Sequence, residues 1–153
     1  MATSHLVAHP APDATALLAD LRAGRLDAAG LIAQHLERLA AVQPTINAAV
    51  QVFDEAARAA AASPRPGVLS GLPVSIKETF DLAGCRITAG SRVMTPIEST
   101  GDAVTVQRLK DAGAIVLARG NVPEFAMAAE TENPRYGRSL NPVSYTHLTL
   151  PTM

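Results

Sequence analysis

The sequence has few cysteines, lysines and aromatic residues, and it has no long apolar run. Its one cysteine, Cys85, excludes an internal disulfide and is typical of a reducing compartment, so we expect a cytoplasmic protein. Every apolar run falls short of the roughly 18–20 residues that a membrane span requires. The segment from Met1 to Pro12 also lacks the basic leader and apolar core of a secretory signal. We therefore expect neither membrane insertion nor secretion.

Positive and negative charges are nearly balanced. The 153 residues carry a net charge of −1 and their arginines are scattered, so we expect neither a nucleic acid nor an anionic membrane as partner. Apolar residues make up 48% and charged residues 18%, which is typical of one soluble globular domain. The sequence has no Cys/His cluster with metal-ligand spacing and no glycine-rich phosphate or dinucleotide loop. We therefore expect no metal and no organic cofactor.

Hydrophobic periodicity predicts helices first and an α/β arrangement after them. The first part is expected to contain a flexible N-terminus over residues 1–12, a helix from Asp13 to Gly24, a helix from Asp27 through about Val42 with Pro44 past its end, a strand within Ile46–Phe53 and a helix over Asp54–Ala62. The second part is expected to contain a buried strand over Val68–Ile76, an irregular stretch over Asp81–Thr100, a helix from Gly101 to Gly113 and a strand over Ala114–Ala118. This order predicts an α/β fold with a mixed, mainly parallel sheet flanked by helices.

Lys77 is the strongest candidate for a catalytic residue. It ends an apolar run in which Leu72, Val74 and Ile76 alternate on one face of the expected strand. Ser75 and Lys77 share the other face, near the carboxyl end where parallel sheets bind ligands. Lysine, unlike arginine, can lose its proton when it is buried, and only two of the thirteen basic residues are lysines. The alternative is a strand-end lysine whose ammonium reaches solvent. A Ser75–Lys77 dyad is disfavoured, because residues two apart on a strand hold their side chains about 7 Å apart.

An ordered series of short motifs includes this strand. The motifs are, in chain order, Gly71–Glu78, Gly90-Ser91, Asp102–Val104, Asp111–Ile115, Asn121–Ala126, Thr131–Gly137 and Asn141-Pro142. Each is unspecific alone, but the ordered set resembles the opening part of the amidase signature family, serine hydrolases that cleave carboxamides. The helical start, with Leu26–Ala28 and Pro44–Ala48, is similar to the lead-in of that family. The resemblance covers roughly Thr15 to Pro142.

The resemblance implies an amidase that cleaves the C–N bond of linear carboxamides with a serine nucleophile, a bridging serine in a cis peptide and a lysine. Lys77 matches the position of that lysine, which accepts a proton through the bridging serine and must be desolvated to be neutral. The substrate would be a small-molecule amide, no cofactor would be needed, and a homo-oligomer would be compatible. One alternative is the A subunit of a glutamyl-tRNA(Gln)/aspartyl-tRNA(Asn) amidotransferase, which would need partner subunits and is compatible with Phe125–Ala128 and Thr131–Asn133. The other is a non-catalytic binding or scaffold module.

The sequence departs from the family pattern after Pro142. The next motif of the family is a Gly-Gly-Ser-Ser-Gly-Gly stretch that supplies the bridging serine and leads to the nucleophile, but here no glycine follows Gly137. Ser144–Thr152 instead resembles a peptide translated from sequencing-adapter DNA. We therefore expect residues 13–142 to be the N-terminal third of an amidase domain, inactive alone. Residues 143–153 are expected to be a non-native tail, in which His147 has no catalytic role.

Other polar residues are expected to support the structure and not the chemistry. Four positions are typical of loop-forming residues: Asn121, Asn133, Gly137 and Asn141. Four carboxylates are expected to be capping or solvated groups, and not an acid–base pair: Glu78, Glu124, Glu130 and Glu132. His35 is expected to be a packed or solvated histidine and not a ligand, and Cys85 is expected to fill the core or a loop and not to be a nucleophile.

Overall fold

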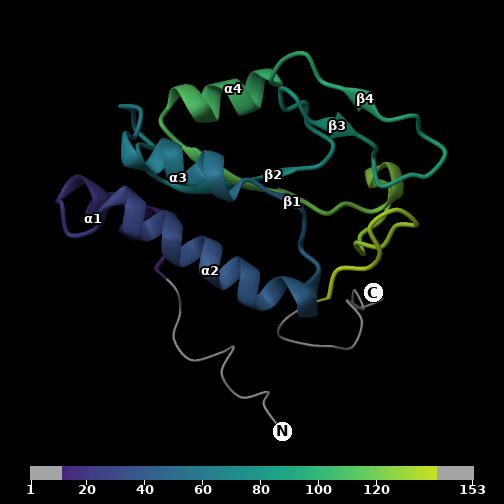
Figure 1. Ribbon diagram of the computed structural model, residues 1–153, viewed down its shortest axis with the longest axis horizontal. Helices are drawn as coiled ribbons and strands as arrows, with labels where there is room; N and C mark the ends of the chain where they lie inside the picture. The colour runs from purple at the N-terminus through teal and green to yellow at the C-terminus, as the bar shows by residue number, and fades with distance from the viewer. Residues whose placement is uncertain (1–11, 141–153) are drawn as a thin grey trace, which may run out of the picture.

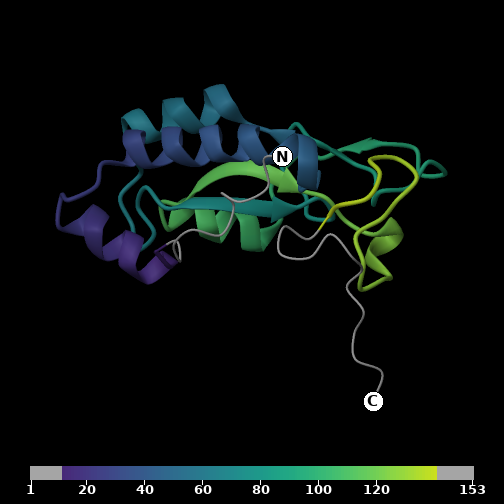
Figure 2. The same cartoon turned by 90° about the horizontal axis from the view of Figure 1, so that it is seen from below.

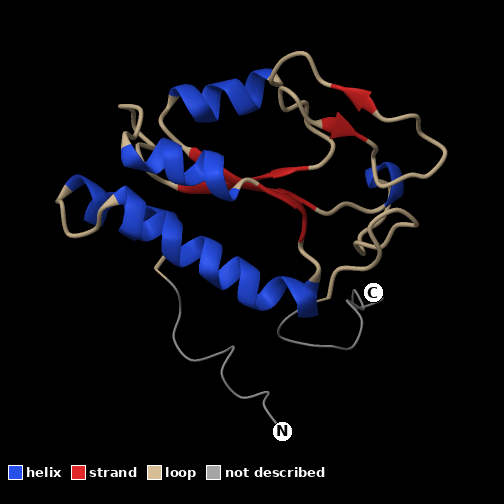
Figure 3. Ribbon diagram, in the orientation of Figure 1, coloured by secondary structure: helices blue, strands red, loops and turns tan. Residues whose placement is uncertain are grey.

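The structure of the chain, a computed structural model, describes residues 12–140 as a mixed sheet with helices on both faces (Figure 1, Figure 3). Its elements are α1 (Ala14–Arg22), α2 (Ala28–Ile46), β1 (Ala49–Val52), α3 (Asp54–Ala62), β2 (Pro73–Lys77), β3 (Arg86–Ile87), β4 (Ile97–Glu98), α4 (Val104–Asp111), β5 (Ile115–Gly120) and the 3₁₀ turn η1 (Glu124–Ala126). This confirms the predicted α/β fold with a helical start. Across residues 12–140, no helix combines the length and apolarity needed to cross a bilayer. The non-native tail predicted over residues 143–153 lies outside the described part, as does all but Pro12 of the N-terminus predicted to be flexible.

Aspartate caps begin the two N-terminal helices, as predicted. The N–H of Ala16 donates to Asp13 Oδ1 at 2.8 Å, and the N–H of Gly30 donates to Asp27 Oδ1 at 2.7 Å. Each aspartate thus satisfies an N–H group that has no partner inside its helix. The first helix ends where the sequence predicted, because Gly24 takes a left-handed conformation with φ of 68°.

The second helix is longer than predicted. It includes Pro44 and ends only at Asn47, which has a left-handed φ of 47°, whereas the sequence predicted an end near Val42. Proline removes one helical hydrogen bond, but Gln43 compensates in the same turn. The carbonyl of Gln43 accepts the N–H of Asn47 at 2.9 Å, and its side-chain amide donates to and accepts from the backbone of Ala49 at 2.6 and 2.9 Å. The helix therefore continues through Pro44 to the start of β1.

The central strand of the sheet is β5, in the order β1-β5-β2. β1 pairs with it antiparallel and β2 pairs with it parallel, so the sheet is mixed, as predicted. β2 begins at Pro73 and not at Val68, because residues 68–71 form turns. The register places Lys77 opposite Gly120, so β2 and β5 end together at one edge of the sheet.

Helices cover both faces of this sheet (Figure 2). α2 and α3 pack on one face in a cluster whose members include Ile32, Leu36, Ala57, Ala61, Ile115 and Leu117. α4 covers the other face in a cluster formed by Ile76, Leu82, Cys85 and Val106. Because β5 is covered on both faces, its first four residues are continuously apolar instead of alternating.

The stretch between β2 and α4 is more ordered than predicted. β3 and β4 form a short antiparallel pair within residues 81–100, where the sequence predicted only irregular structure. Asp102 then attaches this stretch to α4. Its Oδ1 accepts the N–H of Ala83 at 2.9 Å, and its Oδ2 accepts from Lys110 Nζ at 2.6 Å.

The Asp102 contacts give a pH-dependent prediction. Burial alone would raise the pKa of Asp102, but the hydrogen bonds from Lys110 and Ala83 and the charge of Lys110 outweigh it and lower that pKa. A lowered pKa adds stability above the ordinary carboxyl pKa, and this stability is lost as pH falls through the folded value. Asp102→Asn should therefore lower the free energy of unfolding by up to about 1 kcal/mol at pH 7. Urea unfolding should show that the difference fades toward pH ~3, whereas an equal difference at both pH values would contradict the assignment.

Candidate active site

Lys77 lies at the carboxyl end of β2, on the edge of the sheet where the sequence placed it. Ser75 and Lys77 are exposed, and Ile76 between them is buried. Within residues 12–140, the Lys77 side chain makes no hydrogen bond and no ion pair. The desolvated lysine expected from the sequence is therefore not found in the described part of the chain, because β2 is an edge strand and no strand lies on its outer side there.

An open hollow of ≈390 Å³ lies between α2 and the sheet. Its lining is mostly apolar and includes Leu39, Val74, Ser75 and Leu117. The face of β2 that Ser75 and Lys77 share is thus only partly covered by α2. In the described residues Ser75 and Lys77 are not hydrogen-bonded to each other, so the Ser75–Lys77 dyad has no support in the geometry.

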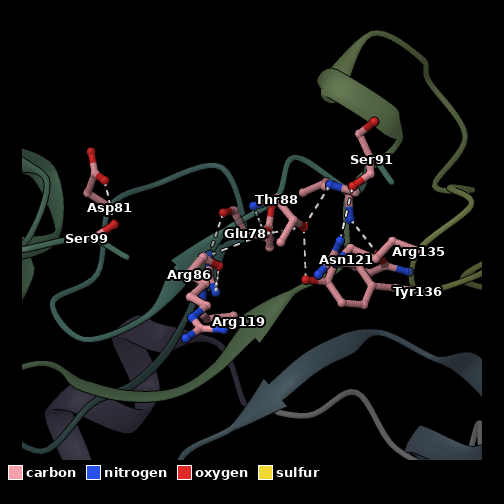
Figure 4. Close-up of polar contacts among 12 residues, drawn as sticks. Glu78, Asp81, Arg86, Thr88, Ser91, Ser99, Arg119, Asn121, Arg135 and Tyr136 are labelled. Atoms are coloured by element: carbon pink, nitrogen blue, oxygen red, sulfur yellow. Dashed lines mark hydrogen bonds and ion pairs between the residues drawn. The ribbon is translucent and has the colours of Figure 1, made fainter. Parts of the chain in front are cut away.

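Glu78, the residue after Lys77, is fully buried. Its Oε1 accepts the N–H of Thr88 at 2.8 Å and the hydroxyl of Thr88 at 2.9 Å (Figure 4). The prediction that Glu78 is a capping or solvated carboxylate is therefore wrong. The alternation of β2 could have corrected it, because the pattern that buries Ile76 and exposes Lys77 also buries the next position.

Arg119 lies beside this carboxylate and is 2% exposed. Its guanidinium donates to the carbonyls of Glu78 at 2.7 Å and Arg86 at 2.9 Å, and Nη2 lies 3.6 Å from Glu78 Oε1. The hydroxyl of Tyr136 is 2.9 Å from Thr88 Oγ1. Since Thr88 gives its one hydroxyl proton to Glu78, Tyr136 is the donor in that contact. We call Glu78, Thr88, Arg119 and Tyr136 the Glu78 network.

A second set of contacts is centred on Asn133. Its side-chain N–H₂ donates to Asn121 Oδ1 at 2.8 Å and to the carbonyl of Val122 at 2.7 Å, while its Oδ1 accepts the N–H groups of Arg135 and Tyr136. Asn133 therefore joins the loop after β5 to the loop that carries Tyr136. This confirms the predicted loop-forming role of Asn121 and Asn133.

The backbone beside the network is strained. Ala89, Phe125 and Ala126 have φ of 48°, 54° and 57°, a region that residues other than glycine rarely adopt. Each such residue costs about 1–3 kcal/mol, and such strain concentrates at functional sites. The N–H of Phe125 donates to the carbonyl of Ala89 at 2.8 Å, so two of the strained segments hold each other.

The remaining candidates have structural contacts. Ser91 donates to Glu124 Oε1 at 2.6 Å, and Arg138 pairs with Glu130 at 3.3 Å, so these two glutamates do not form an acid–base pair. Cys85 packs in the core, as predicted. Asn141, Ser144 and His147 lie outside the described residues. Within the described part, no three His, Cys, Asp or Glu side chains are grouped so as to hold a metal ion.

Comparison with known proteins identifies the protein family of this chain. The family model described as Amidase matches residues 30–149. The chain belongs to the amidase family. This confirms the resemblance to amidase signature enzymes, and the amidase segment includes every residue of the Glu78 network.

Among curated relatives of this amidase segment, the A subunit of a glutamyl-tRNA(Gln) amidotransferase from Acidothermus cellulolyticus is 35% identical over 137 residues. An indoleacetamide hydrolase from Bradyrhizobium diazoefficiens is 37% identical over 132 residues. These alignments cover 84% and 81% of the chain but only 27% and 25% of the relatives. The chain thus spans about a quarter of the length of the relatives that it matches.

Solved structures agree with the fold. A 6-aminohexanoate cyclic dimer hydrolase superposes with a TM-score of 0.81 at 29% identity, covering 88% of this chain and 28% of that one. A peptide amidase from Stenotrophomonas maltophilia superposes with a TM-score of 0.76 at 29% identity, covering 87% and 30%. The fold of this chain is therefore that of a part of these larger enzymes.

The Asn133 contacts give a stability prediction. Asn133→Ala would remove two donors and two acceptor contacts at a position that is 5% exposed, so it should lower the free energy of unfolding by about 2–3 kcal/mol. Urea unfolding measures this loss. Arg92→Ala, at an exposed position, is the control and should change the free energy by less than about 0.5 kcal/mol. Equal effects of the two substitutions would contradict the role given to Asn133.

Proposed function

We propose that this chain is part of an amide hydrolase in which Lys77 is the catalytic base. One observation carries the proposal: a family match over residues 30–149 includes Lys77 at the carboxyl end of β2, where β2 and β5 end together. The names of relatives, an indoleacetamide hydrolase and a peptide amidase, support cleavage of amide C–N bonds. The substrate class proposed is a small-molecule carboxamide. The cytoplasmic location expected from the sequence stays a prediction.

In the proposed mechanism the neutral amine of Lys77 accepts a proton from a bridging serine, which takes the proton of the serine nucleophile. The nucleophile oxygen bonds to the carbonyl carbon, the C–N bond breaks as a proton passes to the leaving nitrogen, and water then releases the acyl group. Both serines are proposed to belong to a part of the protein outside the 153 residues. Lys77 is exposed in the described part, so the proposal also requires further residues to cover β2 and keep water from the amine.

Substitution of Lys77 tests this proposal in the longer protein that carries the segment. Lys77→Ala should lower kcat for a simple carboxamide by about 10²–10⁴, because the general base is lost. Lys77→Arg should be as inactive, since a guanidinium does not give up its proton. Lys110→Ala removes the other lysine, which pairs with Asp102, and should keep kcat within about twofold. A Lys77→Ala enzyme with unchanged kcat would refute the assignment.

The 153 residues alone should not hydrolyse amides. Lys77 is present, but no Gly-Gly-Ser-Ser motif that could supply the two proposed serines follows it in the sequence. Assay of the 153-residue chain with a simple carboxamide should give no hydrolysis above the rate without protein. Hydrolysis that disappears in the Lys77→Ala variant of this chain would overturn this expectation.

A second candidate function is that of the A subunit of a glutamyl-tRNA(Gln) amidotransferase. It is favoured by curated relatives of that name that are 35% and 39% identical to the chain. Hydrolysis of glutamine by the longer protein, together with co-purification of partner subunits, would support it. Hydrolysis of simple carboxamides without any partner would favour the amidase, and a longer protein with neither activity would favour a non-catalytic binding or scaffold module.

A further inference from the structure

Glu78 is fully buried and directly follows Lys77 in the chain. It is 0% exposed, and its Oε1 accepts both the N–H and the hydroxyl of Thr88. A buried position without access to solvent cannot touch a substrate that approaches the exposed Lys77 side. Any effect of Glu78 on the reaction must therefore pass through the residues that it holds.

The peptide group that follows Lys77 is fixed on both sides. The N–H of Glu78 donates to the carbonyl of Gly120 at 3.0 Å, and the carbonyl of Glu78 accepts from Arg119 at 2.7 Å. The carbonyl of Lys77 itself accepts the N–H of Phe80 at 3.0 Å. Because the carboxylate of Glu78 is also hydrogen-bonded to Thr88, the end of β2 can neither rotate nor shift along β5 without breaking these contacts.

A contribution to stability does not explain why the Glu78–Arg119 ion pair is buried here. Glu78 Oε2 and Arg119 Nε have no hydrogen-bond partner in the described residues, and the shortest side-chain contact of the pair is 3.6 Å. Buried ion pairs with unsatisfied atoms contribute little, and apolar residues of similar volume are often as stable. The pair does, however, fix the backbone of β2 at Glu78 relative to the backbone of β5 at Arg119.

We propose that Glu78 is a positioning residue for Lys77, acting through Thr88 and Arg119. The carboxylate of Glu78 attaches the end of β2 to the loop after β3, and Arg119 attaches the carbonyl of Glu78 to β5. These contacts fix the backbone at Lys77, so its amine is positioned at one place on the edge of the sheet. This inference depends on the proposed function of Lys77. Misplacement of a catalytic group by 1 Å lowers a rate by about 10²-fold, so the expected effect falls on kcat.

The test uses the longer enzyme, with its active sites counted to completion by a fluorophosphonate that reacts with serine nucleophiles. Glu78→Gln keeps the shape of the side chain but removes its charge. Its kcat per counted site should fall by about 10–100-fold, with KM within about twofold. Thr88→Val removes the hydroxyl, which donates to Glu78 and accepts from Tyr136, and should also lower kcat, whereas Thr88→Ser keeps the hydroxyl and should retain kcat.

Asp81→Asn is the matched control. Asp81 Oδ1 accepts the hydroxyl of Ser99 at 2.7 Å, a contact of the same kind three residues after Glu78 that lies apart from the Glu78 network (Figure 4). Its kcat per counted site should stay within about twofold of the original, since the contact does not hold the end of β2.

The outcomes separate this inference from the function on which it depends. If Glu78→Gln or Thr88→Val reduces only the number of counted sites, with kcat per site unchanged, the residues are purely structural and the inference is overturned. If Glu78→Gln yields no folded enzyme, the comparison of Thr88→Val with Thr88→Ser decides in the same way. If Lys77→Ala is fully active, the proposed function itself has failed, whatever the Glu78 variants show.

Discussion

The buried guanidinium of Arg119 is the contact on which the candidate site depends. It donates from the central strand to the carbonyls of Glu78 and Arg86, which belong to the end of β2 and the start of β3. Its Nη2 also lies 3.6 Å from Glu78 Oε1 and forms an ion pair with that buried carboxylate. Without it, the carbonyls of Glu78 and Arg86 would lose a donor and the buried carboxylate would lose its ion-pair partner, and each such loss is unfavourable by about 1–3 kcal/mol. The three segments therefore form one rigid unit, on which the loops with Thr88 and Tyr136 are placed.

The parts of the fold that the sequence predicted correctly are those set by local chemistry. Aspartate caps at Asp13 and Asp27 satisfy helix N–H groups three residues away, so a short window contains the whole signal. The end of α2 was missed because Pro44 is a strong local stop, and the compensation by Gln43 needs a contact with Ala49 outside the helix. β3 and β4 were missed because two-residue strands are too short to show a period.

The same distinction applies to the site. Lys77 was proposed from the sequence because strand alternation and a basic residue at the strand end are both visible in seven residues. The partners of Glu78 could not, since Thr88 and Arg119 lie 10 and 41 residues further along the chain, and Tyr136 lies 48 residues beyond Thr88. Only the folded chain brings these positions together. The error at Glu78 came from treating its position at a strand end as evidence of capping or solvation, although its place in the alternation already indicated the buried face.

Lys77 and Glu78 are neighbours with opposite environments, and the alternation of side chains along β2 explains why. Val74 and Ile76 pack in one cluster, so the next position on that face is Glu78, and the register shift between Val74 and Ser75 places its extra residue in β5 and not in β2. A shift of one residue in a strand moves every side chain to the other face. Burial of Glu78 therefore fixes Lys77 on the outer face, and the reverse arrangement would bury an ammonium without a partner and expose a carboxylate. The exposure of Lys77 and the burial of Glu78 are thus one structural choice, made by the alternation of side chains along β2.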